Sequence, residues 1–233
     1  MRAALVTGGS RGIGAAVAHR LAAQGWRVVA VARNAPSHIP DGVAFRGCDV
    51  ADPAAARALV AGMERIDALV NAAGIAGTNP VDASDDILWH AIISVNLHAT
   101  YHCCSAAQAR LPDGIGRIVN IASTLGLRGV ADQTAYCAAK HAVIGYTRAL
   151  ALALAPRGIT VNAVCPGWTD TAMAAARFAD LGITRTEAEA GVPTRRITTP
   201  EEVAASVAFL LSPEAANITG HALPIDGGSL AVP

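Results

Sequence analysis

Tyr136 and Lys140 lie four residues apart in the alanine-rich stretch QTAYCAAKHAVIGYTRAL, residues 133 to 150. On a helix, residues at i and i+4 share one face, so both polar ends can reach the same ligand. A phenol can protonate the alkoxide that develops when a hydride reduces a carbonyl carbon. The pKa of an unperturbed tyrosine is about 10, and a neighbouring ammonium group lowers it. We therefore expect Lys140 to tune Tyr136 as a proton donor.

Ser123 lies thirteen residues before Tyr136, at the end of the strand-like run GRIVNIAS. Its hydroxyl is suited to hold a substrate oxygen in line with the phenol. A single serine or tyrosine at the end of an element usually caps or packs, so the interpretation depends on the joint pattern.

A glycine-rich stretch, VTGGSRGIG, follows the first apolar run of the chain. Glycines permit a tight turn and let a pyrophosphate approach the backbone amides at the positive end of a helix. The spacing is G-x-x-x-G-x-G rather than G-x-G-x-x-G, and an ordinary strand-to-helix turn is the alternative. We predict that this turn contacts a dinucleotide through Gly8, Ser10, Arg11, Gly12, Ile13 and Gly14.

The end of the second strand-like run, VVAVARN, bears on the choice of dinucleotide. An acidic residue there favours NAD, but the chain has Ala32 followed by Arg33. Arg33 and Arg11 can together clamp a 2′-phosphate, unless Arg33 is only a solvated surface side chain. We expect NADP(H) as the cofactor, with NAD(H) less favoured.

The elements that would position these residues alternate between short apolar runs and alanine-rich helical stretches. This alternation predicts one α/β domain over residues 1–233, a Rossmann fold with a doubly wound, seven-stranded parallel sheet flanked by helices. Two prolines in RNAPSHIPDG predict a loop instead of a helix between the second and third strands. The polar, turn-rich segment 168–195 is the expected mobile substrate loop. The predicted strands are 3–7, 27–32, 43–47, 67–74, 116–123, 159–167 and 221–228, and the predicted helices are 13–24, 53–65, 84–110, 135–155 and 200–211.

The composition excludes several classes of protein. The 233 residues are 52% hydrophobic and 15% charged, with 18 basic and 18 acidic side chains and zero formal net charge. Neither a nucleic-acid footprint nor a polybasic membrane anchor is expected, and no apolar run is long enough to span a membrane. The N-terminus lacks the pattern of a signal peptide, and the five cysteines lack CxxC spacing. Both features favour a cytoplasmic protein with reduced thiols.

The segments TGGSRGIG, NAAG and YCAAK, together with Asn96 and Ser123, resemble the short-chain dehydrogenase/reductase family in order and spacing. The resemblance covers essentially the whole chain, including PGWTDT and the terminal DGG. It implies that Asn96, Ser123, Tyr136 and Lys140 are the catalytic residues. In the family, the lysine also binds the nicotinamide ribose, and the asparagine supports a water chain that returns the proton to the tyrosine.

The same resemblance implies further contacts with the cofactor. Asp49 approaches the adenine amino group, and Val50 lies against the ring. DALVNAAG departs from the family pattern, because Ala72 replaces a second asparagine. The turn after the sixth strand meets the nicotinamide carboxamide through one of its threonines. The residues implied are Asp49, Val50, Asn71, Ala72, Gly74, Tyr136, Lys140, Pro166, Gly167, Thr169 and Thr171.

His98 and His102 also lie at i and i+4, next to two cysteines. No acidic third ligand occurs in this stretch, so we expect no metal site. We expect the histidines to line a helix interface, because the family commonly pairs this helix and the Tyr-Lys helix across two-fold axes. The resemblance thus implies a homotetramer or homodimer.

The leading functional prediction is an NADP(H)-dependent ketoreductase acting on a 3-oxoacyl-thioester-like or polyketide substrate, free or bound to a carrier. The alternative is an NAD(H)-dependent dehydrogenase of a small secondary or alicyclic alcohol. A dinucleotide-binding scaffold without activity would be expected to lack a catalytic group. The residues expected around the carbonyl are Leu125, Leu127, Gln133, Trp168 and Met173. The arginines expected at the rim, where they meet a phosphopantetheine or carrier protein or are simply solvated, are Arg128, Arg177, Arg185, Arg195 and Arg196.

Overall fold

The computed structural model describes residues 1–36 and 38–231. Its centre is a seven-stranded sheet in the order β3-β2-β1-β4-β5-β6-β7, with every neighbouring pair parallel. This confirms the predicted fold class, and each predicted strand is present with boundaries within three residues. The strands are β1 (Ala3–Thr7), β2 (Arg27–Ala32), β3 (Val43–Gly47), β4 (Ala68–Asn71), β5 (Arg117–Ile121), β6 (Thr160–Pro166) and β7 (Ala222–Ile225).

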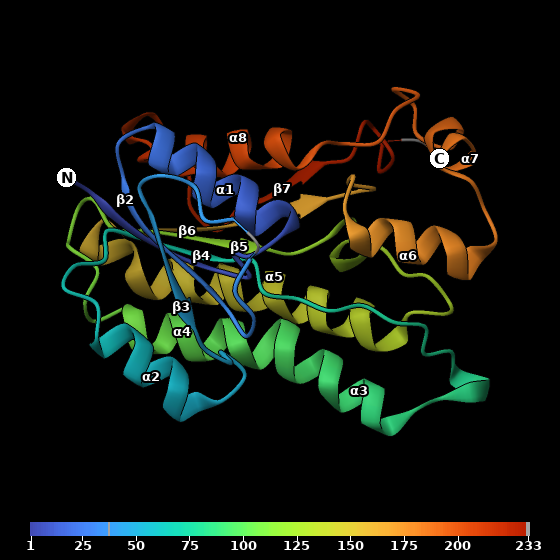
Figure 1. The fold of residues 1–233 in the computed structure, drawn as a ribbon, viewed down its shortest axis with the longest axis horizontal. Coiled ribbons are helices and arrows are strands. Elements are labelled where there is room, and N and C mark those ends of the chain that lie inside the picture. The colour runs from blue at the N-terminus through green and yellow to red at the C-terminus, as the bar shows by residue number, and fades with distance from the viewer. Residues whose placement is uncertain (37, 232–233) are drawn as a thin grey trace.

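Helices cover both faces of the sheet, which explains why its central strands are buried throughout and mostly apolar. In β1, Ala4 and Val6 pack toward one helical layer, and Leu5 packs toward the other. Figure 1 shows α1 and α8 on one face and α2, α4 and α5 on the other. Each buried leucine or valine in these layers contributes about 1.5–3 kcal/mol. The layers consist of α1 (Gly12–Ala23) and α8 (Pro200–Leu210), and of α2 (Pro53–Ala61), α4 (Ala99–Ala107) and α5 (Thr134–Leu154).

The predicted helix 84–110 is one helical run from Asp86 to Ala107 with an altered middle. It consists of α3 (Asp86–Ile93), a π-helical turn (Ser94–His98) and α4. Asp85 begins the run by accepting from the amides of Ile87 and Leu88. A π-helical turn inside a helix often marks a functional position, and this one contains Asn96.

The segment 168–195 corrects one prediction, because it is largely helical where turns were expected. It contains α6 (Ala172–Leu181) and α7 (Arg185–Ala190). Thr171 caps α6, Gly182 ends it in the left-handed region, and Thr184 forms a capping box with Glu187 at the start of α7. Capping residues stabilise these two short helices in a polar segment. Between β2 and β3 the described residues form no helix, as predicted.

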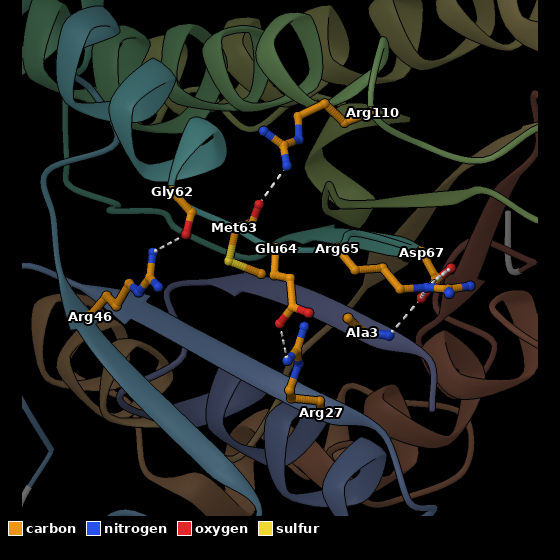
Figure 2. Close-up of polar contacts among 9 residues, drawn as sticks. All are labelled: Ala3, Arg27, Arg46, Gly62, Met63, Glu64, Arg65, Asp67 and Arg110. Carbon is orange, nitrogen blue, oxygen red and sulfur yellow. Dashed lines mark hydrogen bonds and ion pairs between the residues drawn. The ribbon is translucent and has the colours of Figure 1, made fainter.

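The connection from α2 to β4 lies at the amino-terminal edge of the sheet and is held by charged side chains (Figure 2). Arg46 and Arg110 donate to backbone carbonyls of this connection, and Arg27 pairs with Glu64 at 2.7 Å. The carboxylate of Asp67 accepts from Arg65 at 2.7 Å and from the Ala3 amide at 2.8 Å. These contacts fix the start of β4 beside the start of β1. Across the described residues, no helix is both long and apolar enough to cross a membrane.

Candidate active site

Ser123 and Tyr136 meet at the carboxyl-terminal edge of the sheet. Ser123 follows β5 and begins a 3-10 turn, where its Oγ accepts from the Leu125 amide at 3.1 Å. Tyr136 lies in the first turn of α5, and the Ser123 side chain is close enough to its phenol to act on the Tyr136 pKa. The two hydroxyl groups can therefore address the same oxygen atom of a ligand.

Lys140 lies one turn further along α5 and is only 4% exposed. Its Nζ donates to the Ile121 carbonyl at 2.8 Å, which anchors the side chain to the end of β5. The same Nζ lies 5.5 Å from the centroid of the Tyr136 ring. The predicted shared face of the helix is thus present in the structure.

The pKa values at the site differ from the sequence-based expectation. Burial raises the pKa of Tyr136 to about 12, although the Ser123 side chain opposes this shift. Burial lowers the pKa of Lys140 to about 8, opposed by the neighbouring Cys165 thiol. The expected depression of the Tyr136 pKa by Lys140 is therefore wrong for this geometry. Desolvation outweighs the effect of an ammonium group that lies against the ring and is bound to a carbonyl.

Asn96 is held in the π-helical turn by its side-chain amide. Its Nδ2 donates to the Ile75 carbonyl at 2.8 Å and to the Ile92 carbonyl at 2.9 Å. The Oδ1 atom is buried, and none of the residues that the structure describes forms a hydrogen bond with it. A Cβ atom added at Gly74 would lie 2.8 Å from this Oδ1 and 3.8 Å from Lys140 Nζ. Gly74 therefore leaves open the space between Asn96 and Lys140.

The glycine turn leads into α1 without a side-chain cap. Arg11 occupies the N-cap position, and its side chain forms no hydrogen bond with the amides of the first turn of α1. This turn also contains no acidic residue. Side chains of Asp52, Thr171, Thr184 and Thr199 cap α2, α6, α7 and α8. The first amides of α1 thus lack a side-chain acceptor, which fits the pyrophosphate of a dinucleotide. The turn itself needs glycine, because a Cβ at Gly14 would lie 2.3 Å from the Gly8 carbonyl oxygen.

The turn after β6 reaches the glycine turn. A Cβ added at Gly12 would lie 3.3 Å from Thr171 Cγ2. Thr169 Oγ1 donates to the Gly167 carbonyl at 3.1 Å, and Thr171 Oγ1 donates to the Thr169 carbonyl at 3.3 Å. Pro166 ends β6. The hydroxyl groups of both threonines are therefore held by this turn.

Two other predicted cofactor residues lie at the end of β4, where Asn71 is its last residue and Ala72 follows it. Asn71 is buried, and its Nδ2 donates to Asn120 Oδ1 at 2.8 Å, so its side chain is part of a polar contact between neighbouring strands. The amides of Ala72 and Ala73 donate to Thr7 Oγ1 at 3.1 and 3.2 Å. Thr7 thereby ties the end of β4 to the end of β1, where the strand order diverges and ligands commonly bind.

The residues predicted around the adenosine lie at the ends of β2 and β3. Arg11, Arg33 and Asp49 are exposed, and Val50 is buried against Val29 and its neighbours. No side-chain hydrogen bond involves Arg11 or Arg33 within the part of the chain that the structure describes. Both guanidinium groups are free for an anionic ligand. The Asp49 carboxylate accepts from the Ala51 amide at 3.0 Å.

The residues predicted around the substrate differ in their exposure to solvent. Gln133 is buried, and Leu127 and Met173 are exposed. Leu125 is partly exposed beside Ser123. Trp168 packs against Phe178 of α6, with ring centroids 4.9 Å apart.

Three of the five arginines expected at the rim form ion pairs with carboxylates of the same chain. Arg177 pairs with Asp132, Arg185 with both Asp170 and Glu189, and Arg196 with Glu202 through two hydrogen bonds. Arg195 donates to the Ala190 carbonyl. Within residues 1–36 and 38–231, only Arg128 of this set makes no side-chain hydrogen bond.

Sequence patterns did not identify Thr7 or Asp132, both of which organise this edge. Thr7 is an ordinary strand residue in the sequence, and Asp132 lies 45 residues from its partner Arg177.

His98 and His102 have ring centroids 6.3 Å apart, and Tyr101 stacks edge-on against Tyr146. The described residues contain no group of three or more side chains able to hold a metal ion.

Comparison with known proteins agrees with this arrangement. A family model described as enoyl-(acyl carrier protein) reductase matches residues 8–229. The chain is 41% identical to the short-chain reductase protein NovJ of Streptomyces niveus, over 97% of this chain and 92% of that one. It is 39% identical to the 3-oxoacyl-[acyl-carrier-protein] reductase FabG of Salmonella typhimurium, over 98% of this chain and 97% of that one.

The fold closely matches a solved structure of a related enzyme. A crystal structure of actinorhodin polyketide ketoreductase with NADPH matches with a TM-score of 0.89 and 38% identity, covering 98% of this chain and 97% of that one. The chain therefore belongs to the short-chain dehydrogenase/reductase family and is an NAD(P)-dependent oxidoreductase that acts on carbonyl and hydroxyl groups.

Proposed function

We propose that this protein is an NADP(H)-dependent ketoreductase that reduces the ketone of a 3-oxoacyl-thioester-like substrate. The observation that carries the proposal is the meeting of Ser123, Tyr136 and Lys140 at the edge where the uncapped α1 begins. Relatives named as ketoacyl reductases support the choice of reaction.

Each of the three residues has a distinct role in the proposed reaction. The nicotinamide cofactor, when bound, supplies the hydride that reduces the carbonyl carbon. Ser123 holds the substrate oxygen, and Tyr136 gives its proton to that oxygen. With a pKa of about 12, Tyr136 carries its proton at neutral pH, which is the form that reduction requires. Lys140 is mainly charged at neutral pH and compensates the phenolate left after the transfer.

Asn96 is proposed to hold the water molecule through which Tyr136 regains its proton. Its unpartnered Oδ1 faces the space beside Gly74 and Lys140 Nζ. A buried amide oxygen without a partner is a good acceptor for an ordered water molecule. Such a water would connect Lys140 to solvent and let Tyr136 regain its proton through the lysine. Lys140 also has the position to bind the nicotinamide ribose.

The cofactor is proposed to lie across the carboxyl-terminal edge. Free guanidinium groups at Arg11 and Arg33, with Ala32 in place of an acid, support NADP(H) over NAD(H). The pyrophosphate would bind the first amides of α1, and the adenine would lie near Asp49 and Val50. The remaining proposed contacts are Gly8, Ser10, Gly12, Ile13, Gly14, Asn71, Ala72, Gly74, Pro166, Gly167, Thr169 and Thr171.

The substrate is proposed to enter between Ser123 and segment 168–195. This segment, with α6 and α7, is the proposed substrate loop of a single domain that spans residues 1–233. Arg128 is the rim arginine most available to a phosphopantetheine or carrier protein, because its guanidinium is not engaged by the described residues. The aromatic contact between Tyr101 of α4 and Tyr146 of α5 fits a subunit interface in a homodimer or homotetramer.

The test is the loss of nicotinamide absorbance with acetoacetyl-CoA, measured with NADPH and NADH in parallel. Rapid oxidation of NADPH, and much slower oxidation of NADH, is the expected result. No thioester reduction, together with alcohol-dependent reduction of NAD in the reverse direction, would overturn the proposal. The protein would then be the alternative, an NAD(H)-dependent dehydrogenase of a small secondary or alicyclic alcohol.

A further inference from the structure

Arg177 connects three segments that lie beside the proposed site. It lies on α6, where its Nη2 donates to the Asp132 carboxylate and its Nη1 donates to Thr78 Oγ1 at 3.0 Å. The arginine side chain is only 12% exposed. One guanidinium group therefore joins α6 to two loops, one after β4 and the other before α5. A partly buried, forked contact of this kind is more specific than an exposed ion pair.

The two loops that receive Arg177 are bound to each other. The Asn79 amide donates to the Asp132 carbonyl at 2.8 Å, and Asn79 and Gln133 form an isolated parallel β-bridge. Thr134 Oγ1 donates to the Asn79 carbonyl at 2.6 Å. Because these contacts lie directly before Tyr136 in α5, Arg177 holds α6 against the support of the proposed proton donor.

The start of α6 is held at a second place. Thr171 caps the helix, and its Cγ2 atom would be 3.3 Å from a Cβ atom added at Gly12. Arg177 lies six residues later, about 9 Å along the helix axis. The helix thus extends from the glycine turn to the loops before α5, and Figure 1 shows it beyond the strand ends on the side where α5 begins. Both anchors lie next to residues of the proposed site, at Gly12 of the glycine turn and at the loop that leads into Tyr136.

We propose that Arg177 is a positioning residue for substrate, and that its ion pair with Asp132 holds α6 closed over the cleft. This inference rests on the proposed function and deepens it by identifying what sets the substrate affinity. Arg177 does not touch the reacting atoms. In this proposal, Arg177 fixes the position of α6, the helix that also carries Met173. The position of α6 then determines how closely a bound acyl chain is enclosed.

Three variants separate this role from general stabilisation. Arg177→Gln and Asp132→Asn each break the pair with little change in side-chain volume. The double variant Arg177→Asp with Asp132→Arg restores opposite charges in exchanged positions. Arg27→Gln is the matched control, because it removes an arginine from an ion pair at the opposite edge of the sheet. A pair that acts as one unit should show rescue in the exchanged variant.

The first readout is steady-state kinetics with acetoacetyl-CoA at saturating NADPH. Arg177→Gln and Asp132→Asn are expected to raise KM about tenfold and to change kcat by less than about threefold. In the exchanged variant, KM should return most of the way to the wild-type value. An unchanged KM in both single variants, or an equal loss in Arg27→Gln, would overturn the proposal.

The second readout is hydrogen exchange of residues 172–181, which does not depend on the substrate. In Arg177→Gln, hydrogen exchange of these amides should be about ten times faster than in wild type. In the double variant with exchanged charges, the exchange rate should be close to that of wild type. If no carbonyl compound is reduced but exchange behaves in this way, the proposed function fails and the closing contact stands. Unchanged exchange in Arg177→Gln would contradict the closing contact whatever the activity.

Discussion

The two edges of the sheet differ in how the polar groups next to the strand ends are satisfied. At the amino-terminal edge, Arg27, Arg65 and Arg110 are all engaged by carboxylates or carbonyls (Figure 2). At the carboxyl-terminal edge, α1 begins without a cap, Asn96 Oδ1 has no partner, and Lys140 is buried with a backbone carbonyl as its acceptor. Satisfied groups stabilise the fold, whereas unsatisfied ones cost stability and are available to a ligand. The amino-terminal edge has exceptions, because among the described residues Arg117 Nε and Thr160 Oγ1 are also buried without a partner.

This difference separates the residues that stabilise the fold from the residues proposed to take part in catalysis and cofactor binding. Substitutions at the amino-terminal edge should lower the free energy of unfolding and leave turnover intact. Substitutions at the carboxyl-terminal edge should affect turnover or cofactor choice, and some should even stabilise the protein. A stability–activity trade-off of this kind is common at active sites.

The largest expected effect is on turnover in Tyr136→Phe. Removing the phenol hydroxyl removes the proposed proton donor, so kcat should fall about 10³-fold. Binding of NADPH, followed by its fluorescence, should change less than about threefold, because the ring and the glycine turn remain. The melting temperature serves as the control for folding. Turnover within about tenfold of wild type would exclude Tyr136 as the donor.

The second effect is a gain of stability in Lys140→Met. Burial lowers the Lys140 pKa from 10.5 to about 8, so the charged form destabilises the folded state below pH 8. The shift corresponds to about 3 kcal/mol, and losing the bond to the Ile121 carbonyl returns about 1 kcal/mol. Lys140→Met should therefore be about 2 kcal/mol more stable than wild type at pH 7, and inactive.

The pH dependence of that difference provides a check on its cause. In wild type, the unfolded lysine keeps its proton up to pH 10.5, whereas the folded lysine loses it near pH 8. The stability advantage of Lys140→Met should thus shrink as pH rises from 8 to 10.5. Urea unfolding across this range measures it. A constant difference would mean that packing, and not charge, explains the result.

Asp67→Asn tests the other edge. The Asp67 side chain is fully buried, and its burial, which would raise its pKa, is outweighed by hydrogen bonds from Arg65 and the Ala3 amide, which lower it. The variant should lose about 1.5 kcal/mol of stability at pH 7 with unchanged kcat. Because the pKa is lowered on folding, this loss should be complete above about pH 4 and disappear at lower pH. A drop in kcat at equal folded fraction would contradict the separation of the two edges.

The smallest expected effect is on cofactor preference in Arg33→Ala. Removing one of two proposed phosphate contacts should lower kcat/KM for NADPH about tenfold and leave that for NADH within about twofold. Arg20→Ala, an exposed arginine further along α1, is the matched control. An equal response to both cofactors would show that Arg33 does not contact the 2′-phosphate.

Local patterns predicted more of this protein than long-range ones. The strands follow from apolar runs, and the positions of Tyr136 and Lys140 follow from helical spacing within one segment. The pair Arg177 and Asp132 could not be predicted, because exposed charges are common and nothing in a single sequence links residues 45 positions apart. The raised pKa of Tyr136 depends on burial by several elements, which spacing alone does not report.

The central claim is that Tyr136 delivers a proton while a nicotinamide held at the same edge delivers a hydride. A single-turnover experiment with 4-deuterated NADPH and acetoacetyl-CoA tests it most directly, with wild type and Tyr136→Phe compared at equal cofactor occupancy. Wild type should transfer deuterium to carbon 3 of the product, and Tyr136→Phe should do so about 10³-fold more slowly while still binding the cofactor. Equal rates of transfer in the two proteins would contradict the account.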